Sequence, residues 1–192
     1  VERAIALGLT ALALTDHDDV GGAVRFATAA RSAGLPGLLG AELTVDVPLP
    51  AGLSATAAHA LSARVTAEDG TSRLRTHLVC RARRDQPRGE PRVTLEQLAE
   101  NARGLFALTG CTRGWVPQLL TLGARGARDA AGTLAEIFDR RLAVECWDHA
   151  LPEERVLVAE LIPLAKSLDL PWVVTNDVHY ALPRGRIAHD VL

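Results

Sequence analysis

Short apolar runs of strand length alternate along the chain with longer stretches whose apolar positions recur at helical spacing. The strand-length runs, rich in Leu or β-branched residues, occupy 10–14, 38–44, 76–81, 105–109, 142–146 and 172–175. Helical spacing is found at 1–8, 19–33, 94–103, 113–122, 127–139 and 152–168, and a last helix opens near Pro183. Because strands and helices alternate, the pattern predicts an α/β fold with a parallel sheet and crossover helices.

Local signals at element ends support the predicted helices, whereas one segment does not fit the alternation of strands and helices. Residues 94–97, Thr-Leu-Glu-Gln, are typical of a capping-box start, and Pro152 suits a first helical turn. The segment 46–72 is rich in Pro, Ala, Gly, Ser and Thr, so it is expected to be a long loop or insertion with at most a short helix. A second loop is predicted at 83–92. No linker divides the chain, and residues 1–192 are expected to form one domain.

Composition, net charge and cysteine positions limit the classes of protein to which this chain can belong. The 192 residues are 48% hydrophobic, which is enough for one buried core. The net charge of −2 gives no basic excess of the kind that binds nucleic-acid backbones by itself. The cysteines, at 80, 111 and 146, form no CxxC pair, so a reducing cytoplasm is expected. No apolar run approaches the ~20 residues of a membrane span. The chain has no Met and opens on a helix-like stretch, so it is expected to be a fragment.

Residues able to bind metals stand at or near the ends of the predicted strands. In a parallel α/β barrel, the carboxyl ends of the strands converge on one face, which would bring these side chains together. His77 is the exception, because it lies early in its strand. The residues concerned are Asp16, His17, Asp18, Glu42, His77, Cys111, Asp148, His149, Asp177 and His179.

The mixture of imidazole, carboxylate and thiol groups indicates a type of metal. Such donors suit Zn²⁺, Mn²⁺ or Fe, whereas Mg²⁺ and Ca²⁺ prefer oxygen ligands alone. The number of His and carboxylate residues suggests more than one ion. Paired ions can activate water and clamp a phosphoryl group between them, which is the chemistry of hydrolytic phosphoesterases.

Each of these residues also has a purely structural interpretation. Asp18 or Asp19 could cap the following helix, His77 could be a hydrogen-bonded core histidine, and Cys111 could be a small buried apolar residue. Asp177 and His179, two positions apart in an extended segment, favour the ligand interpretation. No role is assigned to His59, His149 or His189, and the arginines of 83–92 are read as a solvated loop.

Several motifs, in the same order along the chain, resemble those of the PHP (polymerase and histidinol phosphatase) domain of bacterial C-family DNA polymerases, the relatives of the polymerase III alpha subunit. These motifs are Leu-Ala-Leu-Thr-Asp-His-Asp at 12–18, Gly-Ala-Glu at 40–42, His-Leu-Val at 77–79, Leu-Thr-Gly-Cys at 108–111 and Thr-Asn-Asp-Val-His-Tyr at 175–180. The stretches 40–44, 110–114 and 145–149 most resemble the error-prone branch of the family, whereas 176–177 and 189–192 look more like the replicative branch. The error-prone branch is favoured.

The resemblance implies a fold and a set of metal ligands. The fold would be a distorted (β/α)7 barrel. The matching positions are those of a histidine ligand, a bridging carboxylate, a further histidine, a cysteine and a closing Asp-x-His pair. In this chain they are His17, Glu42, His77, Cys111, Asp177 and His179.

Two departures from the family pattern stand out. The first strand, with its His-x-His pair, would lie upstream of Val1, so the barrel is expected to be incomplete. The stretch 82–93 is much shorter than the helix-rich segment that the family usually has there. An open parallel edge is expected to favour aggregation.

The resemblance also implies a cellular setting. The parent protein would be a cytoplasmic DNA-directed DNA polymerase of replication or repair. Its partners would be DNA, the polymerase domains of the same chain and other replication or repair proteins, without a membrane. The domain itself would be a phosphoesterase-like metal site or a structural module. The alternatives are a stand-alone metal-dependent phosphatase, similar to histidinol phosphatase, and a catalytically inactive structural module.

Overall fold

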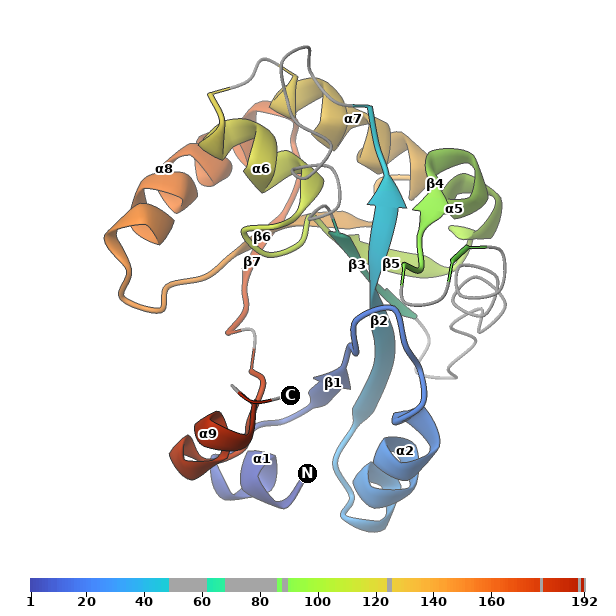
Figure 1. Cartoon of the computed structure of the whole chain (residues 1–192), viewed down its shortest axis with the longest axis vertical. Coiled ribbons are helices and arrows are strands. Elements are labelled where there is room, and N and C mark those ends of the chain that lie inside the picture. The colour runs from blue at the N-terminus through green and yellow to red at the C-terminus, as the bar shows by residue number, and fades with distance from the viewer. Residues whose placement is uncertain are drawn as a thin grey trace.

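A computed structural model describes residues 1–48, 86–87, 90–123, 126–176, 178–189 and 191 in full, and 62–67 as backbone. A mixed sheet lies at the centre, with helices around it (Figure 1). The main path of the sheet follows the order β1-β2-β3-β5-β6-β7, and β4 pairs with β2 off this path. The strands are β1 (Leu12–Leu14), β2 (Gly37–Asp46), β3 (Ser62–Ala67), β4 (Val93–Thr94), β5 (Leu105–Leu108), β6 (Leu142–Cys146) and β7 (Trp172–Val174).

The helices fall within the stretches that the periodicity predicted, with shorter ends. They are α1 (Glu2–Ala6), α2 (Ala23–Ser32), α5 (Leu95–Asn101), α6 (Trp115–Thr121), α7 (Ala127–Ile137), α8 (Pro152–Ser167) and α9 (Arg186–His189), the last preceded by a 3-10 turn (Pro183–Gly185). The capping box before α5 is confirmed, because Gln97 N donates to Thr94 Oγ1 (3.2 Å) and Thr94 N to Gln97 Oε1 (3.0 Å). In the described part of the chain, no helix has the length and apolar character of a membrane span.

The sheet is not uniformly parallel, which corrects the sequence-based expectation. β1 with β2, β5 with β6 and β6 with β7 are parallel, but β3 is antiparallel to both β2 and β5. β3 lies inside 46–72, where a loop was expected. Only Val65 and Thr66 in its sequence are β-branched, so pairing on both sides, rather than local preference, makes this segment a strand. The strand predicted at 76–81 lies outside the described residues.

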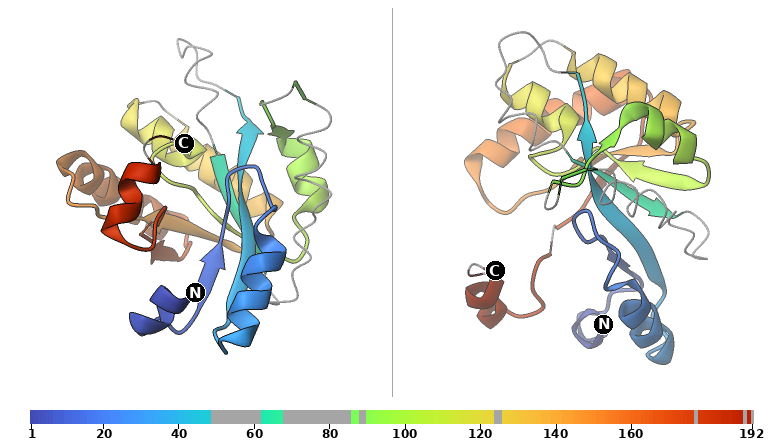
Figure 2. Two further views of the ribbon diagram at one scale, coloured as in Figure 1. Left: turned by 60° about the horizontal axis from the view of Figure 1, so that its bottom comes forward. Right: turned by 45° about the vertical axis from the view of Figure 1, so that its right-hand side comes forward.

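The expected barrel is not confirmed, and the fold is described as mixed α/β. Among the described residues the sheet starts at β1 and ends at β7, and no pairing joins these two strands. The views of Figure 2 show the same separation between β1 and the segment after β7. The edge strand β7 is exposed along its whole length, whereas its neighbour β6 is buried at every position.

The core lies between β5 and β6 and the helices α5 to α8. Leu98, Phe138, Leu142 and Leu161 are each 0% exposed. Burying a large side chain of this kind contributes about 1.5–3 kcal/mol, so this half of the molecule is the better stabilised one. It provides the support on which the carboxyl ends of β5 and β6 are held.

Candidate functional site

His17 and Glu42 are brought together by the backbone at the carboxyl end of β1. Beyond β1 the chain continues beside β2, with an isolated parallel bridge between His17 and Glu42. Glu42 N donates to Asp16 O (3.0 Å) and Asp18 N to Glu42 O (2.7 Å). This register places His17 Nδ1 3.6 Å from Glu42 Oε2. Two of the residues expected to gather at the strand ends thus lie side by side.

Asp18 fixes the other side of the His17 ring. Its Oδ2 lies 3.0 Å from His17 Nε2 and accepts from Thr44 Oγ1 (2.7 Å), while its Oδ1 accepts from Thr44 N (2.8 Å). Asp18 is 4% exposed. Neither Asp18 nor Asp19 caps the next helix, because α2 begins after Gly22 without a side-chain cap. Asp18 therefore ties β2 to the loop and orients His17.

Cys111 reaches the same carboxylate from β5. Its Sγ lies 3.6 Å from Glu42 Oε1, at the end of a tight turn in which Gly114 N donates to Cys111 O (2.7 Å). A Cβ at Gly114 would stand 2.2 Å from Thr109 O, so this turn requires glycine. The strand end and the turn together hold the thiol in a buried position.

The site favours positive charge. The pKa of His17 is raised to about 9 by its hydrogen bonds to Asp18 and then Glu42, which outweigh the opposing effect of burial. Two buried carboxylates beside one ring and one thiol make a place where a cation is stabilised.

The other predicted ligands do not join this cluster. His77 and Asp177 lie outside the described residues. His179 is exposed, and its ring centroid lies 4.7 Å from that of His189. In the part of the chain that the structure describes, no group of three or more His, Cys, Asp or Glu side chains is placed to hold a metal ion together. The six-residue ligand set therefore stays a prediction.

Two acidic residues of this region were not singled out by the sequence reasoning. Glu145 in β6 is 1% exposed, and its Oε1 accepts from Thr175 Oγ1 (2.6 Å). Glu154 in α8 is 5% exposed and pairs with His149. An acid within the apolar run 142–146 was a readable signal for Glu145, but nothing local indicated the partner of Glu154.

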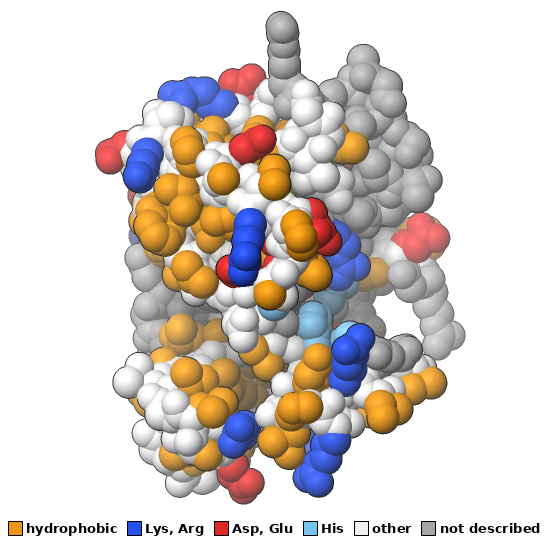
Figure 3. All heavy atoms as spheres, turned by 90° about the vertical axis from the view of Figure 1, so that its left-hand side faces the viewer, with side chains coloured by type: hydrophobic (Ala, Val, Ile, Leu, Met, Phe, Trp, Pro, Cys, Tyr) orange, Lys and Arg blue, Asp and Glu red, His pale blue; other side chains and the backbone are white. Residues whose placement is uncertain are grey.

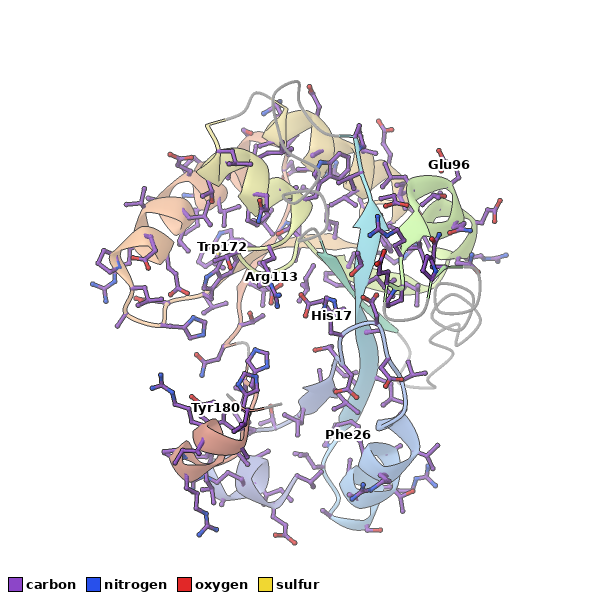
Figure 4. The ribbon with its side chains drawn as sticks, viewed as in Figure 1. His17, Phe26, Glu96, Arg113, Trp172 and Tyr180 are labelled. Carbon is purple, nitrogen blue, oxygen red and sulfur yellow. The ribbon has the colours of Figure 1, made fainter. Side chains whose placement is uncertain are left out.

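The view with side chains labels two residues of this region. In Figure 4, His17 and Arg113 both point into the space between the β1 half and the β6–β7 half. On the face that Figure 3 shows, histidine atoms lie near the middle, beside basic side chains. Arg113 is exposed and makes no hydrogen bond or ion pair within the described residues. Arg113 thus presents an exposed cationic side chain two residues after Cys111, in the turn before α6.

Comparison with protein families gives one match, to the PHP domain, over residues 1–149. Curated relatives include the error-prone DNA polymerase of Symbiobacterium thermophilum, 32% identical over all of this chain and 18% of its own length. The DNA polymerase III subunit alpha of Treponema pallidum is 36% identical over all of this chain and 17% of its own length. The error-prone DNA polymerase of Mycobacterium tuberculosis is 36% identical over 98% of this chain and 18% of its own length.

A solved structure has a similar fold. It is that of a candidate metal-dependent phosphoesterase from Bifidobacterium adolescentis, with a TM-score of 0.57 and 17% sequence identity. The match covers 95% of this chain and 82% of the other. At this identity the likeness concerns the fold alone. The chain spans 17–18% of the length of the curated polymerases named above.

Proposed function

The chain belongs to the PHP domain family, and we propose that it is the PHP domain of a bacterial DNA polymerase of the error-prone or polymerase III alpha type. Its similarity to such polymerases over its whole length supports this. Template-directed nucleotide addition is then the work of the remaining domains of the parent protein. DNA, those domains and other replication or repair proteins are the proposed partners, and the cytoplasm is the proposed location.

Within that family we favour the error-prone branch. The stretches 40–44 and 110–114 resemble it, and error-prone polymerases from several bacteria match almost the whole chain. The polymerase III alpha subunit matches at similar identity, so the replicative branch is the alternative. The parent enzyme's fidelity on undamaged DNA would distinguish the two.

We propose that the cluster at the ends of β1, β2 and β5 is part of a site for Zn²⁺, Mn²⁺ or Fe. The observation that carries this proposal is that His17 Nδ1 and Cys111 Sγ each lie 3.6 Å from an oxygen of Glu42, because nitrogen, oxygen and sulfur ligands suit such ions. Such ions, when bound, polarise a phosphoryl group and activate water. Glu42, which contacts both other side chains, would be the bridging carboxylate ligand. The pairing of Asp18 with His17 would orient the imidazole ring. His77, Asp177 and His179 are the proposed remaining ligands.

The same family membership suggests how the sheet is completed. We propose that the fold is an incomplete (β/α)7 barrel and that a further strand belongs between β1 and β7. Supporting this, Trp172, Val173 and Val174 are 46%, 38% and 65% exposed at an edge strand. Apolar edges of this kind are normally covered or paired.

Phosphoester hydrolysis is the second candidate function. Arg113, which is exposed and follows Cys111 by two residues, favours it because a guanidinium recognises phosphate oxygens. The substrate would be a phosphodiester end in the polymerase, or a small phosphate monoester if the protein were a stand-alone phosphatase. A module with a purely structural role is the remaining alternative, and it predicts neither metal nor hydrolysis.

The metal content of the purified, dialysed protein tests the proposed site. Near-stoichiometric Zn, Mn or Fe is expected in the wild type and is expected to be lost in Cys111→Ser and in Asp177→Ala/His179→Ala. Glu136→Ala, at an exposed position in α7, is the matched control and is expected to keep the metal. A folded wild-type protein without metal would contradict the site and leave the structural module.

A further inference from the structure

His149 connects two elements that meet at the carboxyl end of the sheet. It follows β6 and stands before α8. Its ring lies with Nδ1 2.8 Å from Glu154 Oε1 and with Nε2 3.2 Å from the backbone oxygen of Asn176. Asn176 comes after β7 and immediately before Asp177. One ring thus spans from the first turn of α8 to the segment that carries two of the proposed ligands.

The α8 side of this connection is firmly built. Glu154 is 5% exposed, and its carboxylate accepts from both the ring and the backbone N of His149, the latter over 2.7 Å. The loop before it is held by Asp148, whose Oδ1 accepts from Ala150 N (2.8 Å). Ala150 has a φ of 66°, in the left-handed region that non-glycine residues rarely adopt. His149 is therefore fixed in place from its own side of the site.

On the β7 side, the last strand pairing is followed by two hydrogen bonds of Thr175. Thr175 N donates to Cys146 O (2.9 Å) and Thr175 Oγ1 to Glu145 Oε1 (2.6 Å). After Thr175 the chain leaves the sheet, and the next described tie is the contact of Asn176 O with His149. Both atoms that face the ring are acceptors and neither can donate, so the ring donates from both nitrogens.

We propose that His149 is a positioning residue, which uses Glu154 as its anchor and Asn176 O as its target to fix the path of the segment bearing Asp177 and His179. The proposal rests on the proposed metal-binding function, since its purpose is to hold those ligands in register with the sheet. Groups that orient metal ligands typically alter metal affinity 10- to 100-fold when they are removed.

The variant that separates the two ends of the connection is His149→Gln. A glutamine amide carries both of its N–H groups on one nitrogen, so it cannot replace an imidazole that faces Glu154 with one nitrogen and Asn176 O with the other, and the connection between α8 and β7 is broken. Arg155→Ala is the matched control, because it removes an exposed ion pair with Asp148 (3.3 Å) on the same turn of α8 and leaves His149 intact. Both variants are made in the 192-residue chain.

Co²⁺ titration followed by visible absorption measures the effect on the site. His149→Gln is expected to bind Co²⁺ about tenfold more weakly or worse, with an altered absorption spectrum and an unfolding midpoint close to that of the wild type. Arg155→Ala is expected to match the wild type in all three. Wild-type affinity and spectrum in His149→Gln would overturn the proposal.

Hydrogen exchange of the peptide 175–181 tests the positioning role of His149 independently of metal binding. Faster exchange is expected in His149→Gln and not in Arg155→Ala, whether or not metal is present. If the wild type binds no Co²⁺ but the exchange changes in this way, the metal site fails and the positioning role stands. Unchanged exchange overturns the positioning role. If His149→Gln does not fold, the ¹⁵N chemical shifts of the His149 ring in the wild type test the proposal instead. A ring that lacks a proton on either nitrogen at neutral pH would contradict donation to both Glu154 and Asn176 O.

Discussion

At the scale of single residues, His17 shows how two carboxylates determine the state of one ring. Asp18 and Glu42 approach different ring nitrogens, at 3.0 Å and 3.6 Å. Both acids are at least nine-tenths buried, whereas the His17 side chain is 50% exposed. The protonated ring is therefore stabilised by buried partners while it stays open to solvent. A divalent cation in the same place would meet the same two carboxylates.

The pKa of His17 is the measurable consequence. In protein kept metal-free with a chelator, the ring is expected to titrate near pH 9, followed by the shift of its C2 proton in NMR spectra. Asp18→Asn is expected to lower this pKa more than Glu42→Gln, because the hydrogen bond to Asp18 is the larger cause. A wild-type pKa near the ordinary value of 6.5 would contradict the pairing.

The same shift sets a pH dependence of stability. The folded pKa of about 9 is above the ordinary value of 6.5, so the folded state holds a proton that the unfolded state releases between these values. The stabilising contribution of His17 to the free energy of unfolding is fully present below pH 6.5 and is lost as the pH rises through 9. His17→Gln is expected to remove that part of the slope of unfolding free energy against pH. An unchanged slope in His17→Gln would contradict the raised pKa of His17.

At the scale of elements, the turn from β5 into α6 decides where Cys111 lies. The turn is closed by the bond from Gly114 N to Cys111 O, and it passes Thr109 O so closely that no side chain fits at Gly114. Thr109 is itself 1% exposed and accepts from Glu145 N (3.0 Å) through its hydroxyl. The thiol is thus positioned by a rigid junction between β5, β6 and α6.

Gly114→Ala tests this junction. The added Cβ, 2.2 Å from a backbone oxygen, forces the turn to shift, and a loss of about 1–3 kcal/mol in the free energy of unfolding is expected. Gly132→Ala is the control, because a Cβ there meets nothing within 4 Å in the middle of α7, and it is expected to stabilise by up to about 1 kcal/mol. Urea unfolding measures both. Equal effects of the two substitutions would show that the turn is not tightly constrained.

At the scale of the whole molecule, the two halves of the sheet differ in how well they are covered. β6 is buried at every position under the helices α7 and α8, whereas β7 beside it is exposed at every position. β7 pairs only with β6 in the described part of the chain. An exposed edge with apolar side chains offers unpaired backbone groups to another chain. Self-association is therefore expected to start at β7.

Val174→Lys tests this expectation. Val174 is 65% exposed on β7, and a charge on an edge strand opposes edge-to-edge pairing. Light scattering after gel filtration is expected to show less concentration-dependent association than in the wild type. Val24→Lys, at a position 77% exposed on the helix α2, is the control and is expected to change association little. Equal reduction by both substitutions would indicate a general charge effect rather than pairing at β7.

The sequence by itself determined most of the elements and predicted which residue types would stand at the strand ends. Apolar periodicity is a local property, so it located the helices and most strands, and the pattern at 94–97 predicted a capping box that the structure confirms. The placing of metal-binding residue types at strand ends likewise predicted that His17 and Glu42 would meet. The family motifs are also local, and the match over residues 1–149 agrees with them.

Tertiary structure alone decided the features that depend on distant pairing. β3 is a strand because β2 and β5 flank it, although its own composition favours a loop. Asp18 binds Thr44, 26 positions away, instead of capping α2, and His149 meets Asn176, 27 positions away. No local pattern encodes such partners, because each contact is fixed by the register of strands that only the folded sheet brings side by side.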